Sequence, residues 1–321
     1  MRVGQLSIMT RCMFKKSISL IRYSNYKIGG PADFFYEAKT VEGLEKAVKQ
    51  TRQAKLPFFV LGGGTNLLIS DSGYHGLVLK PSLVSLTARG VLVTAGAGVQ
   101  FSELLDFTVQ KGLSGLEWAG GLPGTVGGAV RGNAGAFRGE TKDMIQEVIS
   151  LDTKSPSCKI TKRSYATCRF GYRTSVFKQD GNREVILSAT FRLKPGDPKT
   201  IREAVEAKIR YRKERHPLEY PNIGSIFKNV AVTDVPKKHL AKLRSVVKQD
   251  PFPVVPVAYL ISEAGLKGVS FGGAMISPKH PNFIVNILNA KASDVKTLIA
   301  LVKDKVKKRF GIQLEEEIIY I

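Results

Sequence analysis

One stretch early in the chain has the clearest chemistry: an apolar run leads into Gly62, Gly63 and Gly64, which Thr65, Asn66 and a second apolar run follow. Glycine lacks a Cβ atom, so its backbone reaches positive φ angles and can approach a ligand closely. Successive backbone N–H groups then form a concave anion site, to which the threonine and asparagine side chains add donors. The stretch is neither a GxxxxGK[ST] nor a GxGxxG motif, because a predicted strand rather than a helix follows it. On its own it is as typical of a tight turn between strands.

A second glycine-rich run covers residues 120–136. Such a density of glycine lets main chain pack against a large flat ligand or against another backbone segment. Close packing of a helix on a strand would explain some of these glycines but not all of them. Two such loops in one domain indicate an extended dinucleotide between them, with its pyrophosphate against backbone amides.

Residues 25–33, 62–66 and 121–130 together resemble the FAD domain of the UDP-N-acetylenolpyruvoylglucosamine reductases, which belong to the vanillyl-alcohol-oxidase-like flavoprotein superfamily. The resemblance implies FAD as cofactor. The cofactor contacts that it implies are Gly62, Gly63, Gly64, Thr65, Asn66, Gly124, Thr125, Gly128 and Asn133. Oxidases of this superfamily often attach flavin through a histidine near the first glycine loop. Residues 58–70 contain neither histidine nor cysteine, so we expect non-covalent FAD. Gly132 departs from the family pattern, which usually has an apolar side chain there.

Three further segments match the same family, at residues 170–178, 224–229 and 314–318. They correspond to its YR-containing motif, its GSxFKN motif and its C-terminal LExE motif. A fourth match, at residues 272–274 and 279–286, says less about mechanism. The resemblance therefore runs from about Tyr23 to the end of the chain. The compact YR motif is similar to the shorter of two family subtypes.

The chemistry that this resemblance implies is reduction of an enolpyruvyl ether to a lactyl ether, with NADPH reducing FAD and the reduced flavin donating hydride to the methylene carbon. Negative charge then develops toward the substrate carboxylate, and the matching Arg173 would stabilise it. The matching Ser225 would donate a proton to the adjacent carbon. Glu317 is the matching carboxylate, and it either holds Arg173 in position or is partly protonated.

Taken singly, each of these residues has a plainer interpretation. An arginine after a tyrosine is usually a surface ion-pair former, a serine after a glycine is usually a turn or helix cap, and a glutamate in a terminal strand usually faces solvent. Their order in matched motifs favours the functional interpretation. For the substrate, the family pattern implies contacts from Lys228 and Asn229, with Tyr172, Lys279 and His280 as weaker candidates.

The elements that must position these residues follow from periodicity and glycine or proline stops. Apolar or β-branched runs predict strands at residues 58–61, 67–70, 76–79, 91–95, 185–193 and, at the end of the chain, 312–321. Amphipathic patterns predict helices at residues 41–54, 101–111, 199–215, 257–264 and 293–309. Gly112, Gly265 and Gly311 follow three of them as C-terminal stops.

Strands interrupted by occasional helices, without strict βαβ alternation, indicate an α+β fold. With the resemblance, we expect a two-lobed FAD-binding domain of the PCMH/VAO-like type at residues 23–195 and a C-terminal α/β substrate-binding domain at residues 196–321. The turn-rich sequence at residues 195–198 marks the boundary. Residues 1–22 would be a disordered N-terminal extension. Its basic, acid-free composition also fits an organelle presequence or a start assigned before Met9 or Met13, and presequence is the less favoured interpretation.

The net charge of +22 in 321 residues raises a different class of function, a basic nucleic-acid-binding protein. The basic residues are, however, spread over segments 199–215, 237–248 and 291–309, which are typical of solvated helix faces. We therefore expect no nucleic-acid partner, and instead a surface that favours small polyanions such as UDP derivatives and NADPH. The nearer alternative is another FAD-dependent oxidoreductase of the same superfamily.

No stretch approaches the ~20 uninterrupted apolar residues of a membrane-spanning helix, so we expect no membrane partner. Cys12, Cys158 and Cys168 are too few and too irregularly spaced for a disulfide framework or a zinc site. They indicate a cytoplasmic protein without a bound metal. The sequence does not encode the oligomeric state visibly, and a monomer is the default expectation.

Overall fold

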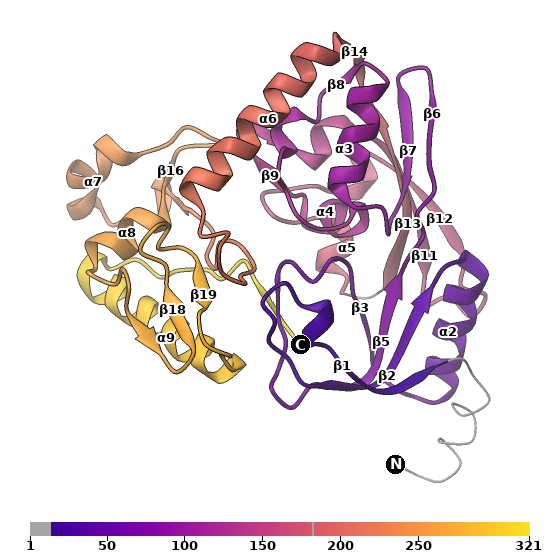
Figure 1. Cartoon of the computed structure of the whole chain (residues 1–321), viewed down its shortest axis with the longest axis horizontal. Coiled ribbons are helices and arrows are strands. Elements are labelled where there is room, and N and C mark those ends of the chain that lie inside the picture. Colours follow the sequence, from indigo (N-terminus) through magenta and orange to yellow (C-terminus); the bar gives the residue numbers. More distant parts are fainter. Residues whose placement is uncertain (1–13, 182) are drawn as a thin grey trace. The chain divides into compact units, whose positions relative to one another are not determined.

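The computed structural model describes residues 14–181 and 183–321, and its chain divides into two compact units (Figure 1). Unit 1 contains the described residues up to Ile18 together with residues 31–63 and 74–210. Unit 2 contains residues 19–30, 64–73 and 211–321. The division into compact units therefore differs from the domain boundary that we predict near residues 195–200. That boundary stays a prediction.

The first lobe of unit 1 is a four-stranded sheet with α2 (Val41–Gln53) packed on it (Figure 1). In spatial order the strands are β1 (Lys15–Ser19), β2 (Pro31–Ala38), β5 (Tyr74–Pro81) and β3 (Phe58–Val60). β2 and β3 both run parallel to β5. The helix buries Leu44, Ala47 and Val48, which lie on one face at helical spacing. It begins after Thr40, whose Oγ1 accepts a hydrogen bond from the Gly43 amide at 3.1 Å.

The second lobe of unit 1 is an antiparallel five-stranded sheet covered by helices (Figure 1). Its strands, in spatial order, are β12 (Ile160–Ser164), β11 (Ile145–Asp152), β13 (Glu184–Arg192), β7 (Leu92–Gly96) and β6 (Leu86–Arg89). α4 (Val126–Gly132) packs against β13 and β7, and α3 (Phe101–Gln110) packs against α4. Val93, Phe101 and Val130 lie in the core that these elements share. The buried cluster around α2 and β2 also contains Leu151, Val185 and Leu187 from β11 and β13, so the two sheets share part of a core.

Short elements complete unit 1. They are the pairs β8 (Leu113–Ser114) with β14 (Lys194–Pro195) and β9 (Gly135–Ala136) with β10 (Gly139–Glu140), the helix α5 (Val176–Gln179), and α6 (Pro198–Arg215), which begins in this unit.

Unit 2 is assembled from three separate segments of the chain around one core. Its strands are β4 (Leu67–Leu68), β15 (Val230–Ala231), β16 (Val254–Val255), β17 (Ser270–Phe271), β18 (Ala274–Ile276), β19 (Ile284–Asn286) and β20 (Ile319–Tyr320), and its helices are α7 (Lys237–Leu243), α8 (Val257–Glu263) and α9 (Ala292–Phe310). β4 pairs in parallel with β20. The early segment joins the core through Tyr26, which is fully buried and donates its hydroxyl hydrogen to the Ile284 carbonyl at 2.7 Å.

The five predicted helices are confirmed, with ends within one residue of the expected ones. Gly112 and Gly311, at φ +64° and +66°, end α3 and α9 as predicted. Three expectations are wrong, and one helix, α4, was not expected at all. Within residues 312–321 only Ile319–Tyr320 form a strand, and within residues 67–70 only Leu67–Leu68 do. Disorder does not hold for residues 14–22, since β1 pairs with β2; residues 1–13 lie outside the described residues.

Cys158 and Cys168 are free, buried thiols. Burial raises the pKa of Cys168 to about 11, so this thiol stays protonated at neutral pH. Within the described ranges, no group of three or more His, Cys, Asp or Glu side chains could hold a metal ion. None of the helices in those same ranges combines the length and the apolar character needed to cross a bilayer.

Candidate functional site

The two glycine-rich runs meet in unit 1. A Cβ atom added to Gly63 would lie 2.7 Å from the Cα atom of Gly124, and one added to Gly62 would lie 3.0 Å from Oγ1 of Thr125. The Thr125 hydroxyl in turn caps α4 and accepts a hydrogen bond from the Gly128 amide at 3.4 Å. The structure thus brings together the parts of both runs that lie in unit 1. Glycine is needed at positions 62 and 63, because a Cβ atom there would press on the Thr125 side chain or on the backbone of Gly124.

A cavity lies beside this contact, with about 480 Å³ of empty space that includes open solvent at its mouth. Gly62, Thr125 and Gly128 line it, together with Gly127 and Arg131. The wall consists of backbone and apolar side chains with one cation, Arg131, and one carboxylate, Glu184, and it fits part of a nucleotide cofactor such as the FAD that the sequence pattern implies. The contacts of these residues with the cofactor stay a prediction.

Substitution of Gly63 by alanine tests this contact. The new methyl group would press on the backbone of the second run, so we expect a loss of about 1–3 kcal/mol in the free energy of unfolding. Gly132→Ala is the matched control, because no atom lies within 4 Å of its added Cβ and alanine favours a helix. Urea unfolding should show destabilisation for Gly63→Ala only. Equal stability of the two variants would contradict the close contact.

The remaining residues of the first loop belong to unit 2. Gly64 has φ +66° and its carbonyl accepts a hydrogen bond from the Asn25 amide at 3.0 Å. Asn66 donates through Nδ2 to the carbonyl of Glu317 at 3.0 Å. Thr65 between them is partly exposed. This half of the loop therefore contacts the C-terminal segment that carries the predicted catalytic carboxylate.

Ser225 and Glu317 are brought together by backbone pairing in unit 2. The amide of Glu317 donates to the carbonyl of Ile226, the residue after Ser225, at 2.8 Å. Asn282 fixes the same segment from the other side: its carbonyl accepts from the Ile226 amide at 2.8 Å, and its side chain exchanges two hydrogen bonds with the Phe227 backbone. The position of Ser225 thus depends on two distant parts of the chain.

Arg173 lies in a tight turn of unit 1. Gly171 and Thr174 exchange two backbone hydrogen bonds, and Arg173 between them has φ +55°, which is unfavourable for a side chain other than glycine. Such strained positions cluster at functional sites. Its guanidinium donates to the Gly135 carbonyl at 2.7 Å and lies 3.9 Å from the Glu140 carboxylate. The Tyr172 ring stacks beneath it, 5.2 Å from Cζ to the ring centroid.

Asn133 has a structural task in the same place. It ends α4 in the left-handed conformation and is fully buried. Its Nδ2 donates to the Gly171 carbonyl at 2.9 Å, and its Oδ1 accepts from the Lys142 amide at 3.0 Å. Asn133 therefore ties α4 to the turn that carries Arg173. Its predicted cofactor contact stays a prediction.

The predicted substrate contacts of unit 2 have partners within the protein. Lys228 forms an ion pair with Glu315, and Asn229 accepts from the Val257 amide at 3.1 Å, at the start of α8. Lys279 donates to the Lys213 carbonyl at 2.9 Å. Burial lowers the pKa of His280 to about 4, so its ring is neutral at pH 7 and can contact a substrate only as a neutral group.

Sequence reasoning missed Arg131 and Glu140. The sequence signal for Arg131 was present, since it is the only charged side chain within the glycine run 120–136. Glu140 follows that run, and only the fold places its buried carboxylate beside Arg173.

Two family models match the chain. The one described as FAD binding domain matches residues 32–155, and the one described as UDP-N-acetylenolpyruvoylglucosamine reductase, C-terminal domain, matches residues 216–321. In solved structures, the chain is similar to the UDP-N-acetylenolpyruvylglucosamine reductase of Thermus caldophilus, with a TM-score of 0.75, 29% identity and coverage of 96% of this chain and 98% of that one.

Curated relatives extend over nearly the whole chain. The UDP-N-acetylenolpyruvoylglucosamine reductase of Clostridium novyi is 35% identical over 313 residues, which are 97% of this chain and 93% of the relative. That of Caldanaerobacter subterraneus subsp. tengcongensis is 37% identical over 298 residues, 92% of this chain and 90% of the relative. The chain therefore belongs to the UDP-N-acetylenolpyruvoylglucosamine reductase family.

Proposed function

We propose that this protein reduces the enolpyruvyl ether of UDP-N-acetylglucosamine enolpyruvate to the lactyl ether of UDP-N-acetylmuramate, with NADPH as reductant. The observation that carries the proposal is the match to reductases of this name over 97% of the chain, with family models on both parts. The protein is accordingly an FAD-dependent oxidoreductase of peptidoglycan precursor synthesis. Its nucleotide substrates are those of the cytoplasm, and we place its action there.

Bound FAD supplies the transfer of a hydride equivalent from NADPH to the methylene carbon of the enolpyruvyl group. The charge that then develops on the substrate carboxylate needs a fixed cation, and we assign this role to Arg173. Its contacts with Gly135 and Glu140 and its strained backbone hold the guanidinium in one orientation before reaction, so little reorganisation is needed. Two N–H groups of guanidinium match the geometry of a carboxylate.

The carbon next to the carboxylate must gain a proton, and we assign this step to the Ser225 hydroxyl. A neutral hydroxyl is a weak acid, but the enolate that it protonates is strongly basic. The proton leaves Oγ for the carbon, and the serine is reprotonated afterwards. The hydrogen bonds of Ile226 and Phe227 with Asn282 and Glu317 hold the backbone next to Ser225 in place within unit 2.

Glu317 pairs through its backbone with the segment that follows Ser225, and we assign it to the proton-transfer step. Glu317→Gln keeps the shape of the side chain and removes its charge, so we expect the rate of substrate reduction to fall about 10- to 100-fold. Stopped-flow absorbance measures this rate. Glu263→Gln, a half-exposed carboxylate on α8 that pairs with Arg309, is the control. An unchanged rate in Glu317→Gln would remove this assignment.

The sequence-based division into a FAD-binding domain at residues 23–195 and a substrate-binding domain at residues 196–321 is kept as part of the proposal. Lys228, Asn229, Tyr172, Lys279 and His280 are proposed contacts for the UDP-sugar. An excess of positive charge suits the phosphates of both nucleotides. We propose a monomer without nucleic-acid partners.

An anaerobic titration tests the function directly. Purified protein should be yellow, NADPH should bleach its flavin absorbance, and UDP-N-acetylglucosamine enolpyruvate should restore the absorbance with one equivalent of substrate per flavin. Reoxidation by another small molecule but not by this one would favour a different oxidoreductase of the superfamily. Colourless protein without flavin would contradict the proposal altogether.

A further inference from the structure

The cavity beside the glycine contact has an uneven charge distribution. Most of its wall is backbone or apolar side chain, and the charged side chains that line it are Arg131 and Glu184. Arg131 lies on α4, the helix whose Thr125 cap and glycines also line the cavity. Glu184 begins β13, the strand on which this helix packs. Whether the two charges neutralise each other decides what the cavity can bind.

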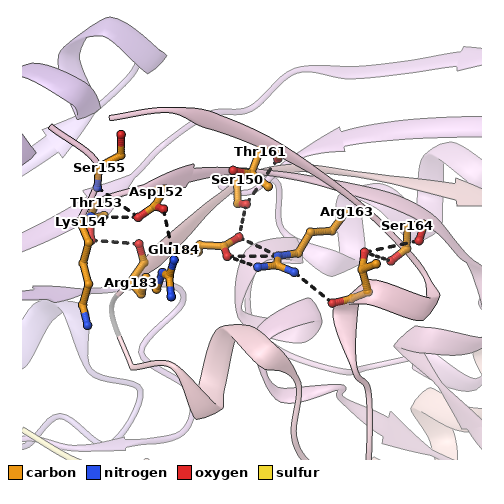
Figure 2. Close-up of polar contacts among 11 residues, drawn as sticks. Ser150, Asp152, Thr153, Lys154, Ser155, Thr161, Arg163, Ser164, Arg183 and Glu184 are labelled. Carbon is orange, nitrogen blue, oxygen red and sulfur yellow. Dashed lines mark hydrogen bonds and ion pairs between the residues drawn. The ribbon is translucent and has the colours of Figure 1, made fainter. Parts of the chain in front are cut away.

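Glu184 is already neutralised by other residues (Figure 2). Arg163, on β12, binds its carboxylate through Nε and Nη2, with Nε 2.9 Å from Oε2, and the Ser150 hydroxyl donates to Oε2 at 2.5 Å. Burial would raise the pKa of Glu184, but these hydrogen bonds outweigh it and leave the pKa below its usual value. The carboxylate is therefore ionised and paired with a cation outside the cavity lining.

Arg131 has no such partner among residues 14–181 and 183–321. Its main-chain carbonyl accepts a hydrogen bond from the Ser175 hydroxyl at 2.7 Å. Burial lowers the pKa of the guanidinium, and no nearby carboxylate offsets this effect. Arg131 is partly buried, and a cation withdrawn from water is as a rule paired with an opposite charge. A bound anion would supply that charge.

We propose that Arg131 is the counter-ion for a phosphate group of the dinucleotide bound in this cavity, namely the pyrophosphate of FAD. The inference rests on the FAD dependence stated above. The amides of Gly127 and Gly128 already donate to the Ala97 carbonyl and the Thr125 hydroxyl, so in this cavity the charge of the anion would be matched by the Arg131 side chain. Guanidinium suits this task because it presents paired donors to phosphate oxygens.

The experiment compares Arg131→Gln with Arg89→Gln in the full-length holoprotein, since Arg89 is an exposed arginine in the same unit and its loss removes the same charge. FAD affinity is measured by the fluorescence of released flavin at low and high salt. We expect Arg131→Gln to weaken FAD binding about 10- to 100-fold and to reduce its salt dependence, with Arg89→Gln close to wild type. Arg131→Lys should recover part of the affinity, because it keeps the charge without the paired donors.

A second readout separates a binding role from a structural one. Removal of this partly buried cation should leave the melting temperature of flavin-free protein unchanged or higher, while that of the holoprotein falls. KM for NADPH and for the UDP-sugar at saturating FAD should not move; a rise in either, with unchanged FAD affinity, would assign Arg131 to that nucleotide's phosphate and overturn the proposal. Unchanged FAD affinity in Arg131→Gln also overturns it. Wild-type protein that binds no FAD would instead contradict the proposed function.

Discussion

Ser225→Ala should lower the rate of substrate reduction by about three orders of magnitude, the middle of the range for loss of a general acid. The rate at which NADPH reduces the flavin should stay as in wild type, because no proton from serine is needed in that step. Stopped-flow absorbance measures the two half-reactions separately. The backbone around Ser225 is held by Asn282 and Glu317 rather than by its hydroxyl, so the variant should fold normally.

Ser270→Ala is the matched control, since Ser270 is an exposed serine of the same unit. It should reduce substrate at the wild-type rate. Ser225→Cys should keep a measurable part of the activity, because a thiol also carries a transferable proton. If the alanine variant reduced substrate within about threefold of wild type, another acid or water would have to supply the proton.

Arg173→Gln should lower kcat by about 10²- to 10³-fold, as expected when one preorganised donor to a developing negative charge is lost. Arg173→Lys keeps the charge but not the fixed fork of donors, so we expect it to recover only part of the rate. Steady-state kinetics on FAD-saturated protein gives kcat and KM. A fall in kcat with little change in KM would show that the contact matters mainly in the transition state.

The control for this arginine is close by. Arg169 is exposed and also has a left-handed backbone, with φ +47° against +55° for Arg173. Arg169→Gln therefore imposes the same change of residue type on a similarly strained backbone. It should leave kcat unchanged, whereas equal losses in the two variants would show that the turn, rather than the guanidinium, had been damaged.

The helices could be predicted well because their information is local. α9 buries Val295, Leu298 and Val302 on one face and ends where Gly311 adopts φ +66°, and both features are visible in the sequence. The parts that could not be predicted depend on distant partners. β1 exists because β2 lies beside it, and the end of the chain keeps a strand only where β4 pairs with it.

In the candidate site, too, features that depend on neighbouring residues could be predicted, and features that depend on residues distant in the sequence could not. Glycines in two runs indicated close backbone contact, and the structure shows Gly63 against Gly124. The same glycines made α4 hard to predict, because each glycine lowers the stability of a helix by about 1 kcal/mol relative to alanine. Capping by Thr125 and burial of Val126, Ala129 and Val130 outweigh that cost. Glu140 and the pairing of Glu184 with Arg163 involve residues that only the fold brings together.

Unit 2 is assembled from segments that lie far apart in the sequence, and this has a consequence for synthesis on the ribosome. Tyr26, Ile28 and Leu68 emerge early, yet they pack in a core whose other members come from the last third of the chain; Tyr26 and Ile284 are separated by 258 positions. At about 5–20 residues per second, more than ten seconds pass between the synthesis of these apolar side chains and that of the last segment that packs against them. The two larger sheets of unit 1 can form meanwhile, since their strands all lie before residue 193. Nascent chains of this protein should therefore depend on holding chaperones until the C-terminal segment is made.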